Sequence, residues 1–323
     1  MIATNRRAWL AGAAASLVAR PAAAQAYPQR PVKIIVPYPA GGGTDALARL
    51  LANAMQQEFG QTLVVDNRGG GASIPGTQAI AAAPPDGYTL GVVDSAFVTN
   101  PGLFREKLPY DTRKDFAPIS LLARNQLLLV VPTGSPHKTG PELIAFARAN
   151  PGKLTFASAG IGTAIHLASE QLRQVGKIDF LTVPYRGGAP ALADLISGQL
   201  DFAFSAFSSI RPHILGGKVR ALGIVGPRLP QAPELPSLDE FGLAGVDAAT
   251  EIGMIAPAAT PPEIIARLNQ LSVAMVKGGA MRERLIEQGS SPLGTTSDEF
   301  RAHIDREIEK WSRVIAAANI KPE

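Results

Sequence analysis

Apolar residues along the chain follow two alternating patterns. Short runs rich in Val, Ile, Leu or Phe predict strands, at residues 32–36, 62–67, 89–94, 127–131, 154–157, 180–183, 202–204 and 221–225. Between them, apolar residues recur every three or four positions and predict helices, at residues 46–54, 74–83, 141–149, 163–175, 189–197 and 210–215. Because strands that alternate with helices usually pair in parallel, the pattern predicts an α/β fold with mostly parallel sheets.

The end of the chain has a helical pattern only, over residues 261–318. Thr296 and Glu299 have the spacing of a capping box, in which each side chain accepts a hydrogen bond from the other residue's backbone N–H. A stripe of large apolar residues follows at helical spacing, formed by Ile304, Ile308, Trp311 and Ile315. We expect this stripe to pack into the core.

Two glycine-rich turns each follow a predicted strand and precede a predicted helix. The first contains Gly41, Gly42, Gly43 and Thr44, and the second contains Gly160, Gly162 and Thr163. A helix that begins after such a turn directs its unpaired N–H groups and the positive end of its dipole toward an anion. Either glycine set alone could serve only to make a tight turn. Their distance along the chain suits one turn in each of two lobes, which favours a small anion held in a shared cleft.

The first turn also fits a dinucleotide-binding fingerprint. Gly41, Gly43 and Ala46 match the spacing of that motif, and Asp66 lies where an acid that binds a ribose would stand. The sequence therefore leaves two classes of function open, an exported NAD(P)-dependent oxidoreductase and a protein that binds a small ligand without chemistry.

No group of residues has the spacing of a catalytic or metal site. Ser73 is not a nucleophile elbow, because Pro75 stands where that motif requires glycine. The four histidines are scattered, and none belongs to a zinc-binding pattern. His166 follows the second glycine turn and is either a packed side chain or a residue at the mouth of that loop. Asp45 at the start of a helix suits a capping role as well as it suits ligand contact.

The first residues have the pattern of an export signal. Arg6 and Arg7 precede a short apolar stretch, and Ala24 and Ala26 provide a cleavage site before Tyr27. The apolar stretch, residues 8–19, is too short to span a membrane. The two arginines followed by Ala-Trp-Leu also resemble a twin-arginine signal, so both export routes remain open. We expect residues 1–26 to be removed on export to the periplasm.

Charge and composition narrow the choice of partners. The chain has 31 basic and 27 acidic residues, and three of the arginines but none of the acids lie in residues 1–26. The remainder is nearly neutral and has no basic cluster with interleaved aromatic residues, so we expect no nucleic-acid partner. The chain has no cysteine, which excludes disulfides and thiolate metal sites.

Ordered blocks of sequence resemble the Bug-type receptors, the extracytoplasmic solute-binding proteins of tripartite tricarboxylate transport systems. The blocks include YPQRPVKIIVPYPAGGGTDALAR, VVDNRGGGASIPGTQAIAAAPPDGYTL, YDTRKDFAPISLL, ELIAFARANPGKLTFASAGIGTAIHLASEQL and VPYRGGAPALADLISGQLDFAF. Gly69 stands where the family often has proline, so the pocket wall there is expected to differ.

The resemblance implies a two-lobed periplasmic-binding-protein (Venus flytrap) fold that closes on its ligand, with helices on both faces of each sheet. It places one lobe at residues 27–125 plus 250–323 and the other at residues 126–249. It implies a monomeric receptor without enzymatic activity, cofactor or metal. The receptor would deliver a dicarboxylate, tricarboxylate, amino acid or aromatic acid to the membrane subunits of a tripartite tricarboxylate transporter.

The resemblance also implies a site in which backbone groups and ordered waters at the two glycine-rich loops hold the ligand carboxylate. The contacts implied in the first lobe are Tyr38, Ala40, Gly42, Gly43, Thr44 and Asp45. Those implied in the second lobe are Ser158, Ala159, Gly160, Thr163 and His166. Ser73, Ser95 and Ser205 are expected around the distal end of the ligand. In this arrangement valine at Gly43 or Gly160 should weaken binding more than loss of Arg68 or Arg186.

Overall fold

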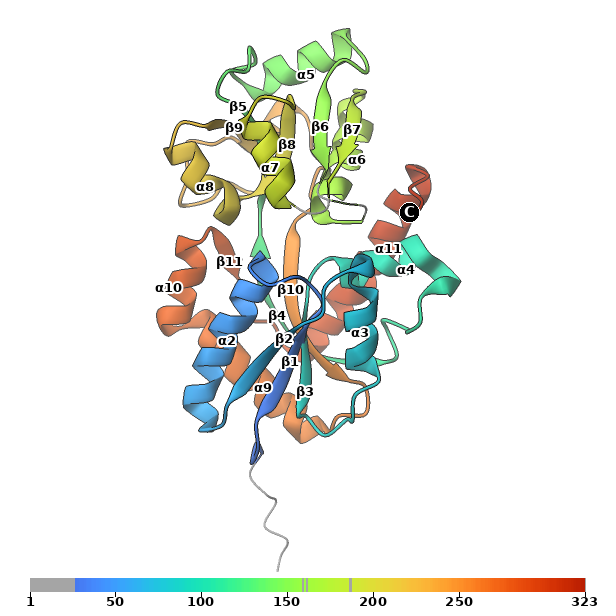
Figure 1. The fold of residues 1–323 in the computed structure, drawn as a ribbon, viewed down its shortest axis with the longest axis vertical. Coiled ribbons are helices and arrows are strands. Elements are labelled where there is room, and N and C mark those ends of the chain that lie inside the picture. The colour runs from blue at the N-terminus through green and yellow to red at the C-terminus, as the bar shows by residue number, and fades with distance from the viewer. Residues whose placement is uncertain (1–26, 159, 161, 186–187, 323) are drawn as a thin grey trace, which may run out of the picture.

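The chain folds into two lobes, each built on one sheet, with two passages of the chain between them (Figure 1). The computed structural model describes residues 27–158, 160, 162–185 and 188–322. The expected export signal, residues 1–26, lies outside the described residues. In the described part of the chain, no helix combines the length and the apolar character needed to cross a membrane.

The first lobe has a six-stranded sheet in the order β11-β4-β10-β3-β1-β2. Its strands are β1 (Val32–Val36), β2 (Leu63–Asn67), β3 (Thr89–Val93), β4 (Phe116–Asn125), β10 (Thr250–Pro257) and β11 (Ser290–Pro292). Its helices are α2 (Gly43–Phe59), α3 (Ile74–Ala81), α4 (Ala96–Phe104), α9 (Pro262–Lys277), α10 (Gly279–Glu287) and α11 (Ser297–Ala317), with short 3-10 turns η2 (Gly71–Ser73) and η3 (Arg105–Lys107). One apolar cluster unites one sheet face with α2, α9 and α10, and another unites the opposite face with α3, α4 and α11.

The second lobe has a five-stranded sheet in the order β7-β6-β8-β5-β9. Its strands are β5 (Leu127–Pro132), β6 (Thr155–Ser158), β7 (Leu181–Pro184), β8 (Phe202–Ala206) and β9 (Val219–Ile224). Its helices are α5 (Gly140–Ala149), α6 (Ala164–Gly176), α7 (Gly188–Ile196) and α8 (Phe207–Leu215), with a 3-10 turn η4 (Leu238–Phe241). Helices α5 and α6 pack on one face of this sheet, and α7 and α8 pack on the other.

The two-lobed α/β fold with helices on both faces of each sheet is confirmed, but the expectation of mostly parallel sheets is wrong. In the first sheet, β1 pairs in parallel with β2 and β3, whereas β10 is antiparallel to β3 and β4. In the second sheet, β6 pairs in parallel with β7 and β8, whereas β5 is antiparallel to β8 and β9. The sheets are mixed because β4, β5 and β10 carry the chain between the lobes. In the described part of the chain, no crossover helix joins them to the strands beside them, and they pair with those strands in antiparallel orientation.

The chain enters the second sheet between Asn125 and Leu127 and returns to the first sheet at Thr250. We keep residues 27–125 plus 250–323 and residues 126–249 as the proposed lobe boundaries. The sequence pattern did not predict β4, β10 or α4. Strand β4 is buried along almost its whole length and so lacks the alternation of a half-exposed strand, while α4 contains Pro101 and the polar residues Thr99 and Asn100.

The helical tail is largely as predicted, with the short strand β11 as an interruption. The capping box of Thr296 and Glu299 begins α11, and both of its hydrogen bonds are present. The predicted apolar stripe of α11 is buried, with Trp311 3% exposed. This stripe packs α11 against the first lobe, and the C-terminal end of α11 reaches toward the second lobe (Figure 1).

Candidate functional site

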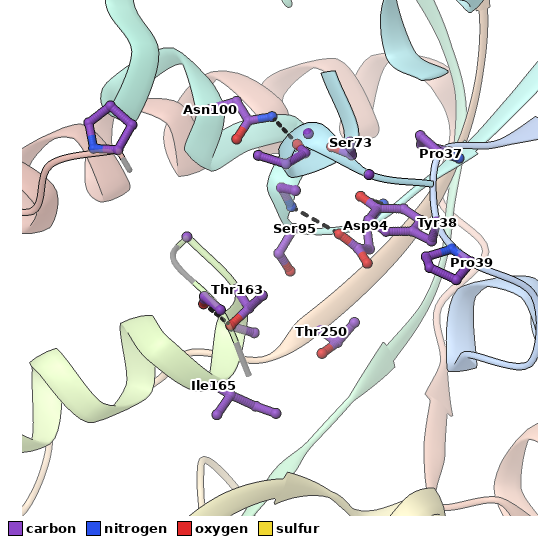
Figure 2. A pocket seen from close by; sticks show the side chains of 18 of the residues that line it. Pro37, Tyr38, Pro39, Ser73, Asp94, Ser95, Asn100, Thr163, Ile165 and Thr250 are labelled. Atoms are coloured by element: carbon purple, nitrogen blue, oxygen red, sulfur yellow. Dashed lines mark hydrogen bonds between the residues drawn. The ribbon is translucent and has the colours of Figure 1, made fainter. Parts of the chain in front are cut away.

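A cavity of about 910 Å³ lies between the two lobes (Figure 2). Loops that follow β1, β2 and β3 line it from the first lobe, and loops that follow β6 and β7 line it from the second. Ligands of open α/β sheets bind at these carboxyl ends of the parallel strands, because adjoining loops separate there and helix N-termini point inward. The volume falls in the usual range for small-molecule sites.

Five of the expected contact residues line this cavity. They are Tyr38, Ser73, Ser95, Gly160 and Thr163. The other described candidates lie outside its lining. They are Ala40, Gly42, Gly43, Thr44, Asp45, Ser158, His166 and Ser205. Ala159 lies outside the described residues, as does Arg186.

The first glycine turn is held by its own acid. The buried carboxylate of Asp45 accepts hydrogen bonds from the Gly41 N–H at 2.8 Å, the Asn67 amide at 2.9 Å and the Arg49 guanidinium at 3.1 Å. The pKa of Asp45 is lowered, because these hydrogen bonds outweigh the opposing effect of burial. Asp45 therefore takes up one N–H of the glycine turn and places a negative charge in the first turn of α2, where a dinucleotide phosphate would otherwise lie.

Gly42 and Gly43 line a separate hollow of about 210 Å³, together with Asn125 and the first turn of α8. Gly43 has an ordinary helical backbone, and a β-carbon there would have an ordinary contact of 3.7 Å with the Asn125 amide. Nothing in the fold requires glycine at this position. The two glycine turns therefore have the same sequence pattern but different surroundings.

The second glycine turn is more constrained. Gly160 has a φ of +117° and Gly162 a φ of +76°, values that L-residues with a side chain rarely adopt. Thr163 is the N-cap of α6, since its hydroxyl accepts from the His166 N–H at 3.3 Å and donates to the Gly160 carbonyl at 2.8 Å. The first turn of α6, at Ala164 and Ile165, lines the cavity. N–H groups in this position have no partner within their own helix.

The buried side chain of His166 stabilises this turn through a hydrogen bond with Gly162. The side chain is 8% exposed, and its Nδ1 accepts a hydrogen bond from the Gly162 N–H at 3.2 Å. Burial, and secondarily the charge of Arg173, lowers the pKa of His166 from 6.5 to about 4. The low pKa corresponds to a neutral ring, and the accepting Nδ1 places the ring proton on Nε2. His166 is thus a packed side chain that holds the loop.

The pKa shift of His166 predicts a loss of stability in acid. The unfolded state takes up this proton near pH 6.5 and the folded state only near pH 4, so the stabilisation is complete above pH 6.5 and is lost as the pH falls toward 4. His166→Asn keeps an acceptor for Gly162 but does not titrate. Urea unfolding at pH 7 and pH 5 should show that the wild type loses about 1–2 kcal/mol more than the variant. Equal losses would contradict this role.

Asp94 also lines the cavity, although no sequence motif indicated it. Its carboxylate accepts hydrogen bonds from the Ala96 N–H at 3.0 Å and from the Thr44 hydroxyl at 3.1 Å, and its own N–H donates to the Tyr38 hydroxyl at 3.3 Å. Burial raises the pKa of Asp94 although these donors act in the opposite direction. Burial, followed by the charge of Asp94, keeps the pKa of Tyr38 well above its usual value. A lone acid at the end of a strand belongs to no motif, so its role could not be recognised from the sequence pattern.

Two serines have different positions around the cavity. The Ser73 hydroxyl oxygen is buried and has no hydrogen-bond partner in the described part of the chain. Ser73 and Ala72 have positive φ values of +66° and +52°, a strained backbone that the Asn100 amide supports by donating to the Ala72 carbonyl. Ser95 instead donates to the Ala249 carbonyl at 2.9 Å and accepts from the Glu251 N–H at 3.1 Å. Ser95 thus connects a lining loop to the segment that returns from the second lobe.

Gly69 and Gly76 allow the lining loops of the first lobe to approach one another. A β-carbon at residue 69 would lie 2.6 Å from the Pro39 nitrogen, and one at residue 76 would lie 2.7 Å from the Arg68 carbonyl oxygen. Backbone atoms cannot yield at such distances without moving a loop. Gly69, the departure noted in the sequence, therefore stands directly against a loop that lines the cavity.

Positive side chains are absent from the described lining of the cavity. Arg68 lies outside it and pairs with Asp66 at 2.9 Å. Asp66, the ribose-binding candidate of the oxidoreductase interpretation, therefore pairs with a neighbouring arginine away from the cavity. Within the described residues, no group of three His, Asp or Glu side chains has metal-binding geometry.

Comparison with known proteins agrees with the family resemblance of the sequence blocks. Residues 47–320 match the family described as the tripartite tricarboxylate transporter family receptor. The fold is similar to that of Rpa4515 from R. palustris, solved with adipate, at 32% identity and a TM-score of 0.85, over 92% of this chain and 100% of that one. It is similar to the periplasmic binding protein BugD at 32% identity and a TM-score of 0.82, with the same coverage. It is also similar to MatC from Rhodopseudomonas palustris, solved with bound malate, at 30% identity and a TM-score of 0.79, over 90% of this chain and 100% of that one.

Proposed function

This chain belongs to the tripartite tricarboxylate transporter receptor family, and on that premise we propose that it is a periplasmic receptor for a small carboxylate. It binds the ligand in the cavity between the lobes without chemical change and delivers it to the membrane subunits of a tripartite transporter. It acts as a monomer after removal of residues 1–26. The adipate and malate in the related structures support carboxylate as the ligand class.

The observation that carries this proposal is the junction of β6 and α6 at the cavity. Gly160, Ala164 and Ile165 all line it, so the ligand carboxylate can lie against the first turn of a helix. The helix dipole and unpaired N–H groups stabilise an anion there without a guanidinium or ammonium group. The described lining has no lysine or arginine, which fits a backbone-based site of this kind.

The remaining expected contacts have supporting roles in this proposal. Thr44 donates to Asp94, Asp45 holds the first glycine turn, and His166 holds the second. Ser158 ends β6 and accepts from the Tyr185 N–H at 2.8 Å, which aligns the two loops of the second lobe. Ala40, Gly42, Gly43 and Ser205 are proposed to approach the ligand only when the lobes close further.

A thermal-shift screen tests the proposed function. The panel contains dicarboxylates, tricarboxylates, amino acids, aromatic acids and neutral sugars, with the chain lacking residues 1–26 as the sample. At a concentration 100 times its dissociation constant, a true ligand should add about 2.7 kcal/mol to the free energy of unfolding. Stabilisation by a neutral sugar, with no response to any carboxylate, would overturn the proposal.

A further inference from the structure

The wall of the cavity formed by the first lobe carries a half-buried acid, Asp94, without a cation beside it in the described part of the chain. Asp94 lies among Tyr38, Ser95 and Thr250 and faces the loop at Thr163 across the cavity (Figure 2). Among the described residues, no lysine, arginine or histidine forms an ion pair with Asp94, although fourteen other such pairs connect described side chains. A carboxylate in such a position usually has a counter-charge.

The hydrogen bonds around Asp94 favour its ionised form. Both carboxylate oxygens already accept, one from the Ala96 N–H and the other from the Thr44 hydroxyl. These donors are part of the fold, because Ala96 begins α4 and Thr44 lies in the first turn of α2. Burial opposes these donors and raises the pKa of Asp94, so a cation at the cavity surface would stabilise the carboxylate that the donors hold in place as an acceptor.

We propose that the ligand is an amino carboxylate, with its ammonium group against Asp94 and its carboxylate against the first turn of α6. The inference rests on the proposed receptor function and names the class of its ligand. An ammonium group has three N–H donors, and Asp94 presents its carboxylate oxygens to them on a wall that also includes Ser73, whose buried hydroxyl oxygen has no partner among the described residues. The two walls thus present an acid and a helix N-terminus, which complement the two charges of a zwitterion.

A dicarboxylate without an amino group fits these groups less well. Its second carboxylate would lie beside Asp94 in a cavity whose described lining offers no cation, so one of the two acids would have to take up a proton. Adipate and malate, the ligands of the related structures, carry no amino group. We therefore expect this receptor to differ from those relatives in the group that it recognises opposite the carboxylate.

Calorimetric titration with matched acids tests this inference. The sets are aspartate, malate and succinate, and glutamate, 2-hydroxyglutarate and glutarate, whose members differ in an amino group, a hydroxyl group or neither. In at least one set, the amino acid should bind at least about tenfold more tightly than both other members, corresponding to about 1.4 kcal/mol. Asp94→Asn should abolish most of this preference, while Asp66→Asn, an acid outside the cavity, should leave it unchanged.

The possible outcomes separate the inference from the function. Tightest binding of an amine-free acid, here or in the wider panel, overturns the inference and leaves the receptor function intact. Equal binding of the hydroxy and amino members overturns it as well, because Asp94 would then recognise a neutral donor. A preference that survives Asp94→Asn also contradicts it. Should Asp94→Asn fail to fold, the preference of the wild type among the matched acids decides whether the inference holds. Failure of every carboxylate contradicts the receptor function itself.

Discussion

Gly160→Val is expected to weaken ligand binding roughly 100-fold while the protein still folds. Gly160 has a φ of +117°, and a β-branched residue at such an angle costs on the order of 1–3 kcal/mol or forces the loop into another conformation. A changed loop loses the hydrogen bond from the Thr163 hydroxyl to the Gly160 carbonyl and moves the first turn of α6. A cost of 2.7 kcal/mol corresponds to about 100-fold in affinity.

Gly134→Val is the matched control for this variant. Gly134 lies in the same lobe, is exposed, has no left-handed backbone and leaves open space for a side chain. Its substitution should change affinity less than about threefold, since it disturbs neither the cavity nor the packing. Calorimetric titration of both variants with the tightest ligand of the screen makes the comparison. Binding by Gly160→Val at wild-type strength would show that this loop does not hold the ligand.

Phe156→Ala is expected to lower the free energy of unfolding by about 3–5 kcal/mol, the usual cost of removing a large aromatic side chain from a core. Phe156 lies in β6 and is fully buried, with ring centroids 5.6 Å from Phe180, 5.2 Å from Phe202 and 6.1 Å from Phe204. Its removal leaves a cavity surrounded by rings that cannot all move inward. Urea unfolding measures the loss.

Phe146→Ala provides the comparison for the core variant. Phe146 belongs to α5 of the same lobe but is 38% exposed, so its removal should cost about 1 kcal/mol or less. The folded fraction of Phe156→Ala should still bind ligand, because Phe156 does not line the cavity. A similar loss of stability in both variants would mean that the aromatic cluster is not the core of the second lobe.

The sequence predicted the positions of most strands and helices because their apolar patterns are regular. It did not predict the antiparallel pairing of β4, β5 and β10, since pairing depends on where the chain passes between lobes. It also did not distinguish the two glycine turns. Gly41 is followed by Asp45, which takes up its N–H, while Gly160 belongs to a turn closed by Thr163.

The expected equivalence of Gly43 and Gly160 therefore has no support in the geometry. Gly43 is helical and has room for a β-carbon, whereas Gly160 has a left-handed backbone. Asp94 was missed for a related reason. Its importance comes from burial, from Thr44 and Ala96 as donors, and from the cavity beside it, all of which are tertiary features.

A crystal structure of the protein with the acid that binds most tightly tests the central claim most directly. We expect one ligand in the cavity between the lobes, with its carboxylate within hydrogen-bond distance of the backbone N–H groups of Gly160, Ala164 or Ile165 and without a guanidinium partner. A ligand held in the separate hollow at Gly42 and Gly43, or a carboxylate neutralised by an arginine side chain, would contradict binding by the helix N-terminus.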